Sequence, residues 1–278
     1  MKHTSTAYTA DVAPSAEMAT LQLIDLTTGY RSRHATHVVA SHLNASLHSG
    51  RLTCLLGPNG AGKSTILRTM AAFQPPLSGH INLGTRRLDS FTPRELATRI
   101  GIVLTERPDM KGMTVTDLVS MGRSPYTGFW GKLSANDQTQ VREAIRLVGI
   151  EPLSQRSVNT LSDGERQKVM IAKVLAQQTP VILLDEPTAF LDFPSKVEMM
   201  LLLQRLAHQM HKTVFISTHD LELALQTADQ LWLMAPQETL VIGSPEELSA
   251  DGSLSRFFSG PGIHFVPSEK RFVIKTIE

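Results

Sequence analysis

The stretch "GPNGAGKST", Gly57 to Thr65, fills every fixed position of the pattern G-x-x-x-x-G-K-[ST]. The apolar run "RLTCLLG" precedes it and the helix-like run "GKSTILRTMAAF" follows it, which is the context that the pattern requires. Glycines let backbone N–H groups close around a phosphate without a side-chain clash. Lys63 adds a positive charge for the outer phosphates, and the Ser64 hydroxyl suits Mg²⁺. A glycine-rich turn with an incidental lysine is the plainer alternative, but match and context together favour a phosphate loop. Its candidate binding residues are Gly57, Pro58, Asn59, Gly60, Ala61, Gly62, Lys63, Ser64 and Thr65.

A second stretch, "VILLDE" from Val181 to Glu186, supplies two adjacent carboxylates after an apolar run. Four apolar residues predict a buried strand, and ligands of such sheets lie beyond the carboxyl ends of the strands. Asp185 and Glu186 follow that end. A helix cap or a surface pair is the structural alternative. Next to a phosphate loop, we expect Asp185 to hold the Mg²⁺ shell and Glu186 to act as general base on a water molecule.

The third stretch, "NTLSDGERQKVM" from Asn159 to Met170, is typical of a helix start. Ser162 occupies the cap position and Glu165 follows three residues later, as in a capping box. The N-terminal end of a helix attracts anions, because its free N–H groups and its dipole point outward. Asp163 and Glu165 nevertheless place two carboxylates on the first turn. The residues alone therefore leave open whether this turn faces a phosphate.

The bulk composition excludes several classes of protein. The chain has 278 residues, 41% of them apolar, which is enough for a packed interior. Its formal charge of +1 argues against a broad nucleic-acid-binding face. Cys54 is the only cysteine, so no internal disulfide can form. No apolar run approaches the roughly 20 residues of a membrane span, and the tract "MMLLL" (199–203) is expected to be a packed helix face.

The order of the patterns predicts an α/β fold with two additions. Alternating and turn-rich sequence from Leu21 to about Gly50 predicts antiparallel strands, and apolar strands alternating with helices after residue 165 predict a mostly parallel sheet with flanking helices. A helical block separates these parts. We expect a flexible leader at 1–19, a main domain at 20–250 with a helical lobe inserted at about 106–165, and a short C-terminal extension at 251–278.

Five elements in this order resemble the nucleotide-binding subunits of ABC transporters. They are "GPNGAGKST", "LSDGE" (161–165), "VILLDEPT" (181–188), "FLD" (190–192) and "STHD" (217–220). The resemblance extends from about Leu21 to Ser249 and implies a P-loop NTPase core that uses ATP and Mg²⁺. A phosphate loop alone would leave kinases, GTPases and helicases open.

The resemblance also implies roles for individual residues. Two subunits close head to tail, and each ATP lies between the phosphate loop of one and the signature "LSDGE" of the other. Ser162, Asp163, Gly164 and Glu165 would then approach the partner's γ-phosphate. His219 matches the switch histidine that contacts this phosphate, and Tyr30 matches the aromatic residue that stacks on adenine. Asp192 matches the loop that crosses the dimer interface. A structural histidine and a core or turn tyrosine are the plainer alternatives.

Two positions depart from the family pattern. The usual signature is LSGGQ, whereas this chain has Asp163 and Glu165 in place of the first glycine and the glutamine. A carboxylate near a phosphate is unfavourable unless it points away or pairs with a cation, and Arg166 and Lys168 are close in sequence. We expect Asp163 to turn aside. The family's metal-contacting glutamine is also missing, and Thr105 or Glu106 would replace it.

The expected partners follow from the same resemblance. With no membrane span on the chain, the resemblance implies a second copy, a separate permease at the cytoplasmic face of the inner membrane and, indirectly, a substrate-binding protein. The segment "MGRSPYTGFWGKLSANDQ" (121–138) resembles importers of iron–siderophore complexes, haem or cobalamin through its GR-x-P element. Tyr126, Phe129 and Trp130 there form either a protein interface or a local core. A soluble regulatory ATPase is the rival hypothesis.

Overall fold

A six-stranded sheet forms the centre of the computed structural model, which describes residues 20–32, 35–105, 110, 112–128, 131–235, 240–258, 262–266, 269 and 271–274. The strand order is β10-β9-β3-β8-β7-β6. Only β10 runs antiparallel to its neighbour among these described strands, so the predicted mostly parallel sheet is confirmed. The bounds are β3 (Leu52–Leu56), β6 (Ile100–Val103), β7 (Val181–Asp185), β8 (Thr213–Thr218), β9 (Gln230–Leu233) and β10 (Val241–Gly243).

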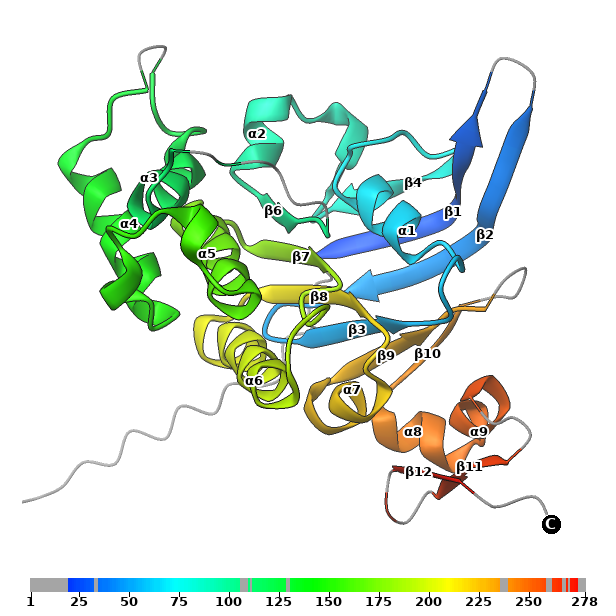
Figure 1. The fold of residues 1–278 in the computed structure, drawn as a ribbon. Helices are drawn as coiled ribbons and strands as arrows, with labels where there is room; N and C mark the ends of the chain where they lie inside the picture. Colours follow the sequence, from blue (N-terminus) through cyan, green and yellow to red (C-terminus); the bar gives the residue numbers. More distant parts are fainter. Residues whose placement is uncertain are drawn as a thin grey trace, which may run out of the picture.

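Side chains of this sheet alternate between two apolar clusters, one on each face. Cys54, Leu184 and Ile216 join the cluster that contains residues of α5 (Asp163–Ala176), α6 (Phe193–Met210) and α7 (Leu221–Thr227). Leu183 and Phe215 face the other way, toward α1 (Lys63–Met70). Figure 1 shows α6 and α7 on one side of the sheet and α1 on the other. Burial on both faces explains why the strands are continuously apolar in sequence.

The predicted antiparallel part is a four-stranded sheet in the order β2-β1-β4-β5. Its strands are β1 (Leu21–Arg31), β2 (Thr36–Leu47), β4 (Ser78–Leu83) and β5 (Arg86–Arg87). Leu23, Leu43 and Ile81 of this sheet share a cluster with Ile66 of α1. The two short helices that follow, η1 (Leu88–Ser90) and α2 (Pro93–Ala97), lead to β6.

A helical lobe lies between β6 and β7 in the chain. It contains α3 (Val115–Ser120), η2 (Met121–Arg123), α4 (Ala135–Leu147), η3 (Glu151–Leu153) and η4 (Val158–Thr160). Val115, Leu118 and Val141 belong to the same cluster as α5 and the sheet, so the lobe and the core share apolar packing through α5. In Figure 1 this lobe stands at one end of the molecule, beside α5.

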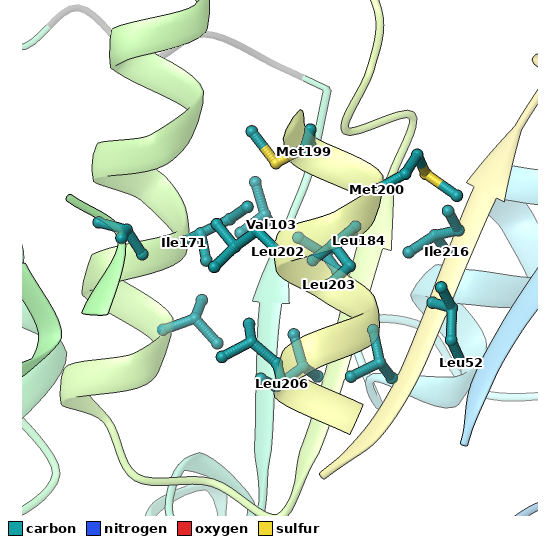
Figure 2. Packing of buried hydrophobic residues seen from close by; sticks show 14 of the residues in the cluster. Leu52, Val103, Ile171, Leu184, Met199, Met200, Leu202, Leu203, Leu206 and Ile216 are labelled. Carbon is teal, nitrogen blue, oxygen red and sulfur yellow. The ribbon is translucent and has the colours of Figure 1, made fainter. Parts of the chain in front are cut away.

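The tract 199–203 lies on α6, as its apolar composition suggested. Met199, Met200, Leu202 and Leu203 are buried, whereas Leu201 is exposed, which is the pattern of a helix with one packed face. Figure 2 shows these buried side chains against strand residues such as Leu184 and Ile216.

The C-terminal part continues with α8 (Pro245–Ala250), α9 (Ser253–Phe258) and a hairpin of β11 (Ile263–Val266) and β12 (Arg271–Ile274). The rings of Phe265 and Phe272 lie 4.9 Å apart, and Phe265 joins the main cluster. A surface pocket lined by Phe272, Phe193 and His219 places this hairpin beside the loop that follows β8.

Candidate nucleotide-binding site

The loop between β3 and α1 is packed so tightly against neighbouring residues that two of its glycines have no room for a side chain. A Cβ on Gly62 would lie 2.0 Å from Cγ1 of Val39, and Gly62 has a φ of +105°, which favours glycine. A Cβ on Gly57 would lie 2.3 Å from the carbonyl oxygen of Met234. This loop leads into the N-terminal end of α1, so its backbone N–H groups are available to an anion. The geometry fits the phosphates of a nucleotide.

Lys63 begins α1 and is buried, with 5% of its surface exposed. Its Nζ donates to the carbonyl oxygens of Gly57 (2.9 Å) and Pro58 (3.2 Å). Burial lowers the pKa of the Lys63 ammonium, while the carboxylates of Glu186 and Asp185 act in the opposite direction. Because this ammonium is partly shielded from water, a phosphate placed beside it would be attracted more strongly than at an exposed lysine.

Glu186, Lys63 and His219 meet at the carboxyl ends of β7 and β8. Glu186 Oε1 lies 3.8 Å from Lys63 Nζ, and Glu186 Oε2 lies 3.7 Å from His219 Nδ1. The Glu186 backbone has a φ of 49°, and its N–H donates to the carbonyl (3.1 Å) and the hydroxyl (3.0 Å) of Ser217. A non-glycine residue in this region is strained, and such strain is concentrated at functional sites.

Asp185 ends β7 and is buried beside Glu186. Its Oδ1 accepts a hydrogen bond from the Ser217 hydroxyl at 2.5 Å, which fixes the carboxylate. The Thr105 hydroxyl donates to the backbone carbonyl of Asp185 at 3.0 Å, which places Thr105 next to the end of β7. Ser64 lies exposed in the first turn of α1. These oxygen donors fit Mg²⁺ chemically; Glu106, the alternative to Thr105, lies outside the described residues.

Asp220, the residue after His219, is held in place by two polar contacts. Asp220 accepts hydrogen bonds from the Thr188 hydroxyl (2.6 Å) and from Lys196 Nζ (2.8 Å). Burial would raise the pKa of Asp220, but the bonds from Lys196 and Thr188 outweigh it and lower the pKa. Thr188 follows Glu186 by two residues, so these contacts tie the loop after β7 to the loop that carries His219.

Tyr30 lies at the edge of the phosphate loop. Its hydroxyl is 2.6 Å from the Thr65 hydroxyl, and 49% of the tyrosine is exposed. The structure therefore places Tyr30 next to the phosphate loop and leaves about half of the residue accessible.

The predicted helix start at Ser162 is confirmed. Ser162 caps α5 with a full capping box: its hydroxyl accepts from the Glu165 N–H (3.3 Å), and its own N–H donates to Glu165 Oε2 (2.8 Å). Glu165 also pairs with Arg156 at 3.5 Å. Lys168, one of the two nearby cations that could compensate this turn, bonds to Glu198 at 2.7 Å, and its charge also lowers the pKa of Glu165, less than that of Arg156 does.

Arg156 is a residue that sequence reasoning missed. It precedes Glu165 by nine residues, and neither the period of a helix nor that of a strand predicts a contact at this spacing. The short helix η4 lies between the two residues in the chain. Arg166, the other expected cation, lines a pocket with Asp163, Asp185 and Glu186. Asp163 and Gly164 also line a groove beside Asp192, whose side chain caps α6 by accepting from the Ser195 N–H at 3.0 Å. Phe190 and Phe193, on either side of this cap, are exposed.

The described residues of the GR-x-P segment attach the helical lobe to the end of α5. Arg123 is only 2% exposed and donates to Asp137 (2.8 Å), to the Ala176 carbonyl (2.6 Å) and to Gln178 (2.8 Å). The Tyr126 hydroxyl donates to the Gln177 carbonyl at 2.9 Å. Tyr126 therefore bonds to the end of α5 while 39% of it stays exposed, so both the interface and the local-core interpretation remain predictions. Phe129 and Trp130 lie outside the described residues.

The fold and the loop define a P-loop ATPase. A family model described as ABC transporter matches residues 40–189. The achromobactin transport ATP-binding protein CbrD of Dickeya dadantii is 36% identical over 84% of this chain and 86% of that protein. The ferric enterobactin transport ATP-binding protein FepC of Escherichia coli is 34% identical over 87% and 88%. The solved structure of CbiO1 from Clostridium perfringens, part of the ABC transporter complex CbiONQ, gives a TM-score of 0.74 at 29% identity and covers 86% of this chain and 94% of that one.

The chain therefore belongs to the ABC transporter family, as one of its ATP-binding and ATP-hydrolysing cassettes. The predicted fold class, a P-loop NTPase core with an antiparallel sheet and a helical lobe, is confirmed. Within the described residues, the structure contains no helix with the length and apolar character of a membrane span.

Proposed function

We propose that this ATPase powers a bacterial importer that takes up an iron complex through a separate membrane permease. The transport proteins for achromobactin and ferric enterobactin support a siderophore as the substrate. Haem and cobalamin remain alternatives from the GR-x-P resemblance. The chain would act as a peripheral subunit at the cytoplasmic face, as a pair of copies, and would meet a substrate-binding protein only through the permease.

The observation that carries the chemistry is the placement of Glu186 between Lys63 and His219. We assign Glu186 as the base that accepts the proton of the attacking water. Lys63 and His219 stabilise the charge of the transferring γ-phosphoryl group. Ser217 holds the Glu186 backbone and the Asp185 carboxylate, so the two acids keep separate orientations.

Mg²⁺ would neutralise phosphate charge when bound, and Ser64, Asp185 and either Thr105 or Glu106 would hold it. Tyr30 would stack on adenine, since its ring is accessible beside Thr65. The phosphate loop, 57–65, would bind the phosphates through the backbone N–H groups of its residues other than Pro58. Across the seam, the signature turn 162–165 of the second copy would close on the γ-phosphate through the Ser162 hydroxyl and the N–H groups around Gly164. The carboxylates of Asp163 and Glu165 would point away from it, and the Asp192 loop of each copy would lie at the interface.

Uptake of ⁵⁵Fe-labelled siderophore in cells that lack the chromosomal gene tests the proposal. The wild-type gene should restore uptake, whereas Glu186→Gln should abolish it while the purified variant still binds ATP. Glu222→Gln is a matched control, because Glu222 is an exposed carboxylate on α7 near His219. ATPase activity without restored uptake of siderophore, haem or cobalamin, and without a co-purifying permease, would favour the rival soluble ATPase.

A further inference from the structure

The ionised carboxylate of Glu165 is held in the first turn of α5 by a hydrogen bond to the backbone. Its carboxylate accepts the Ser162 N–H at 2.8 Å, which completes the capping box of α5. This backbone bond lowers the pKa of Glu165 against the opposing effect of burial. The side chain is therefore ionised at neutral pH and stays in the first turn of α5.

That charge is unfavourable if the same turn faces a phosphate, as proposed above. Two unit charges about 8 Å apart, in an effective dielectric of 20 to 80, change a binding constant roughly two- to thirtyfold. A cassette with a glutamate here needs a cation that neutralises it without entering the phosphate site.

Arg156 has the geometry for this task. One guanidinium nitrogen, Nη1, lies 3.5 Å from Glu165 Oε1, and the other, Nη2, donates to the Thr160 carbonyl at 2.7 Å. Its backbone is fixed as well, because its carbonyl accepts the N–H of the buried Val115 at 3.0 Å. The fork of an arginine can hold both partners at once, which an ammonium at this position could not do equally well. Lys168 also lowers the pKa of Glu165 through its charge, less than Arg156 does, but its Nζ bonds to Glu198 of α6 at 2.7 Å.

We propose that Arg156 is a positioning residue of the signature: it neutralises Glu165 and keeps that carboxylate on its capping bond, turned from the γ-phosphate of the partner copy. This inference rests on the proposed function, since it assumes that the signature approaches ATP. It explains how a glutamate serves where the family pattern has glutamine, and it assigns to the lobe a residue outside the five family motifs.

A double-mutant cycle on ATP hydrolysis tests the proposal. Arg156→Ala should raise KM for Mg·ATP about fivefold with kcat within about twofold, and the effect should shrink at high salt. Glu165→Gln keeps the capping box, removes the charge that Arg156 would neutralise, and serves as the reference for the second arm of the cycle. In the Glu165→Gln background, loss of Arg156 should change KM by less than about twofold, because the carboxylate with which Arg156 pairs is gone. Arg142→Ala is the control, an exposed arginine of the same lobe that bonds to Thr139 of its own helix.

Two outcomes of the cycle would overturn the proposal: an unchanged KM in Arg156→Ala, or equal damage with and without the Glu165 carboxylate. The second would mean that Arg156 acts through the Thr160 carbonyl alone. A ¹³C NMR titration of the Glu165 carboxyl then separates this inference from the proposed function. Arg156→Ala should raise the Glu165 pKa and Arg142→Ala should not. An absent shift refutes the pairing even if the chain hydrolyses ATP, whereas a wild-type chain without ATPase activity refutes the proposed function even if the shift is present.

Discussion

Replacing Gly122 with alanine should destabilise the junction between the helical lobe and α5. Gly122 lies in η2, where an added Cβ would sit 2.1 Å from the Lys173 carbonyl oxygen and 3.2 Å from the Ala176 Cβ. Carbon–oxygen contacts are normally no closer than about 3.3 Å. The methyl group can therefore fit only if η2 and α5 separate by about 1 Å, since the nearest atom is backbone.

The expected loss of stability follows from that displacement. A shift of this size would weaken the adjacent hydrogen bond from Arg123 to the Ala176 carbonyl, now 2.6 Å long. Overpacking of a well-filled site costs about 1–3 kcal/mol and a lost hydrogen bond about 1 kcal/mol. We expect the free energy of unfolding to fall by about 2–4 kcal/mol in total, which is a large part of the stability of a typical domain.

Urea unfolding followed by circular dichroism measures this change. Gly128→Ala provides the matched control, because Gly128 belongs to the same segment and an added Cβ there would meet no atom within 4 Å. The control should stay within about 0.5 kcal/mol of the wild type. If Gly122→Ala were as stable as Gly128→Ala, the close approach of η2 to α5, and with it the anchoring role of the GR-x-P segment, would be wrong.

Three further predictions concern the site. Asp163→Gly should change the ATPase rate only modestly, and a rise of about a hundredfold or more would show that the Asp163 carboxylate opposes the phosphate. The bonds from Lys196 and Thr188 lower the pKa of Asp220, so the stability that this carboxylate contributes is present above its unfolded pKa of about 3.9 and is lost as pH falls below it. The difference in unfolding free energy between the wild type and Asp220→Asn should therefore shrink from pH 7 to pH 3, and a constant difference would contradict the contacts. Tyr30→Phe should bind ATP within about threefold of the wild type, whereas Tyr30→Ala should bind about tenfold more weakly; equal affinities would exclude stacking on adenine.

The sequence predicted those parts of the molecule that depend on local pattern. The glycine-rich loop, the apolar strand before Asp185 and the capping box at Ser162 each follow from neighbouring residues, and the structure has all of them. The tract 199–203 packs as a helix face because its period is helical. The antiparallel sheet and the inserted lobe follow from changes in that period along the chain.

Local sequence patterns could not predict contacts between segments that are distant in the chain. Arg156 reaches Glu165 through an irregular turn, and the Tyr30 hydroxyl meets Thr65 across 35 residues. Arg166 and Lys168 are the cations that could compensate the signature carboxylates by nearness in sequence, but the Lys168 ammonium bonds to Glu198 of α6. The close packing of Gly122 on α5 likewise depends on how two helices cross, which one chain segment does not encode.

The mass of a hydrolysis-deficient variant in the presence of nucleotide tests the central claim, that ATP is held between two copies of this chain. Purified Glu186→Gln with Mg·ATP, measured by light scattering, should have about twice the chain mass of 30.5 kDa, and should return to the monomer mass with ADP. When the permease is present, we expect two copies of the chain in each complex with Mg·ATP. A Glu186→Gln chain that binds Mg·ATP but remains monomeric, with and without its permease, would contradict the account.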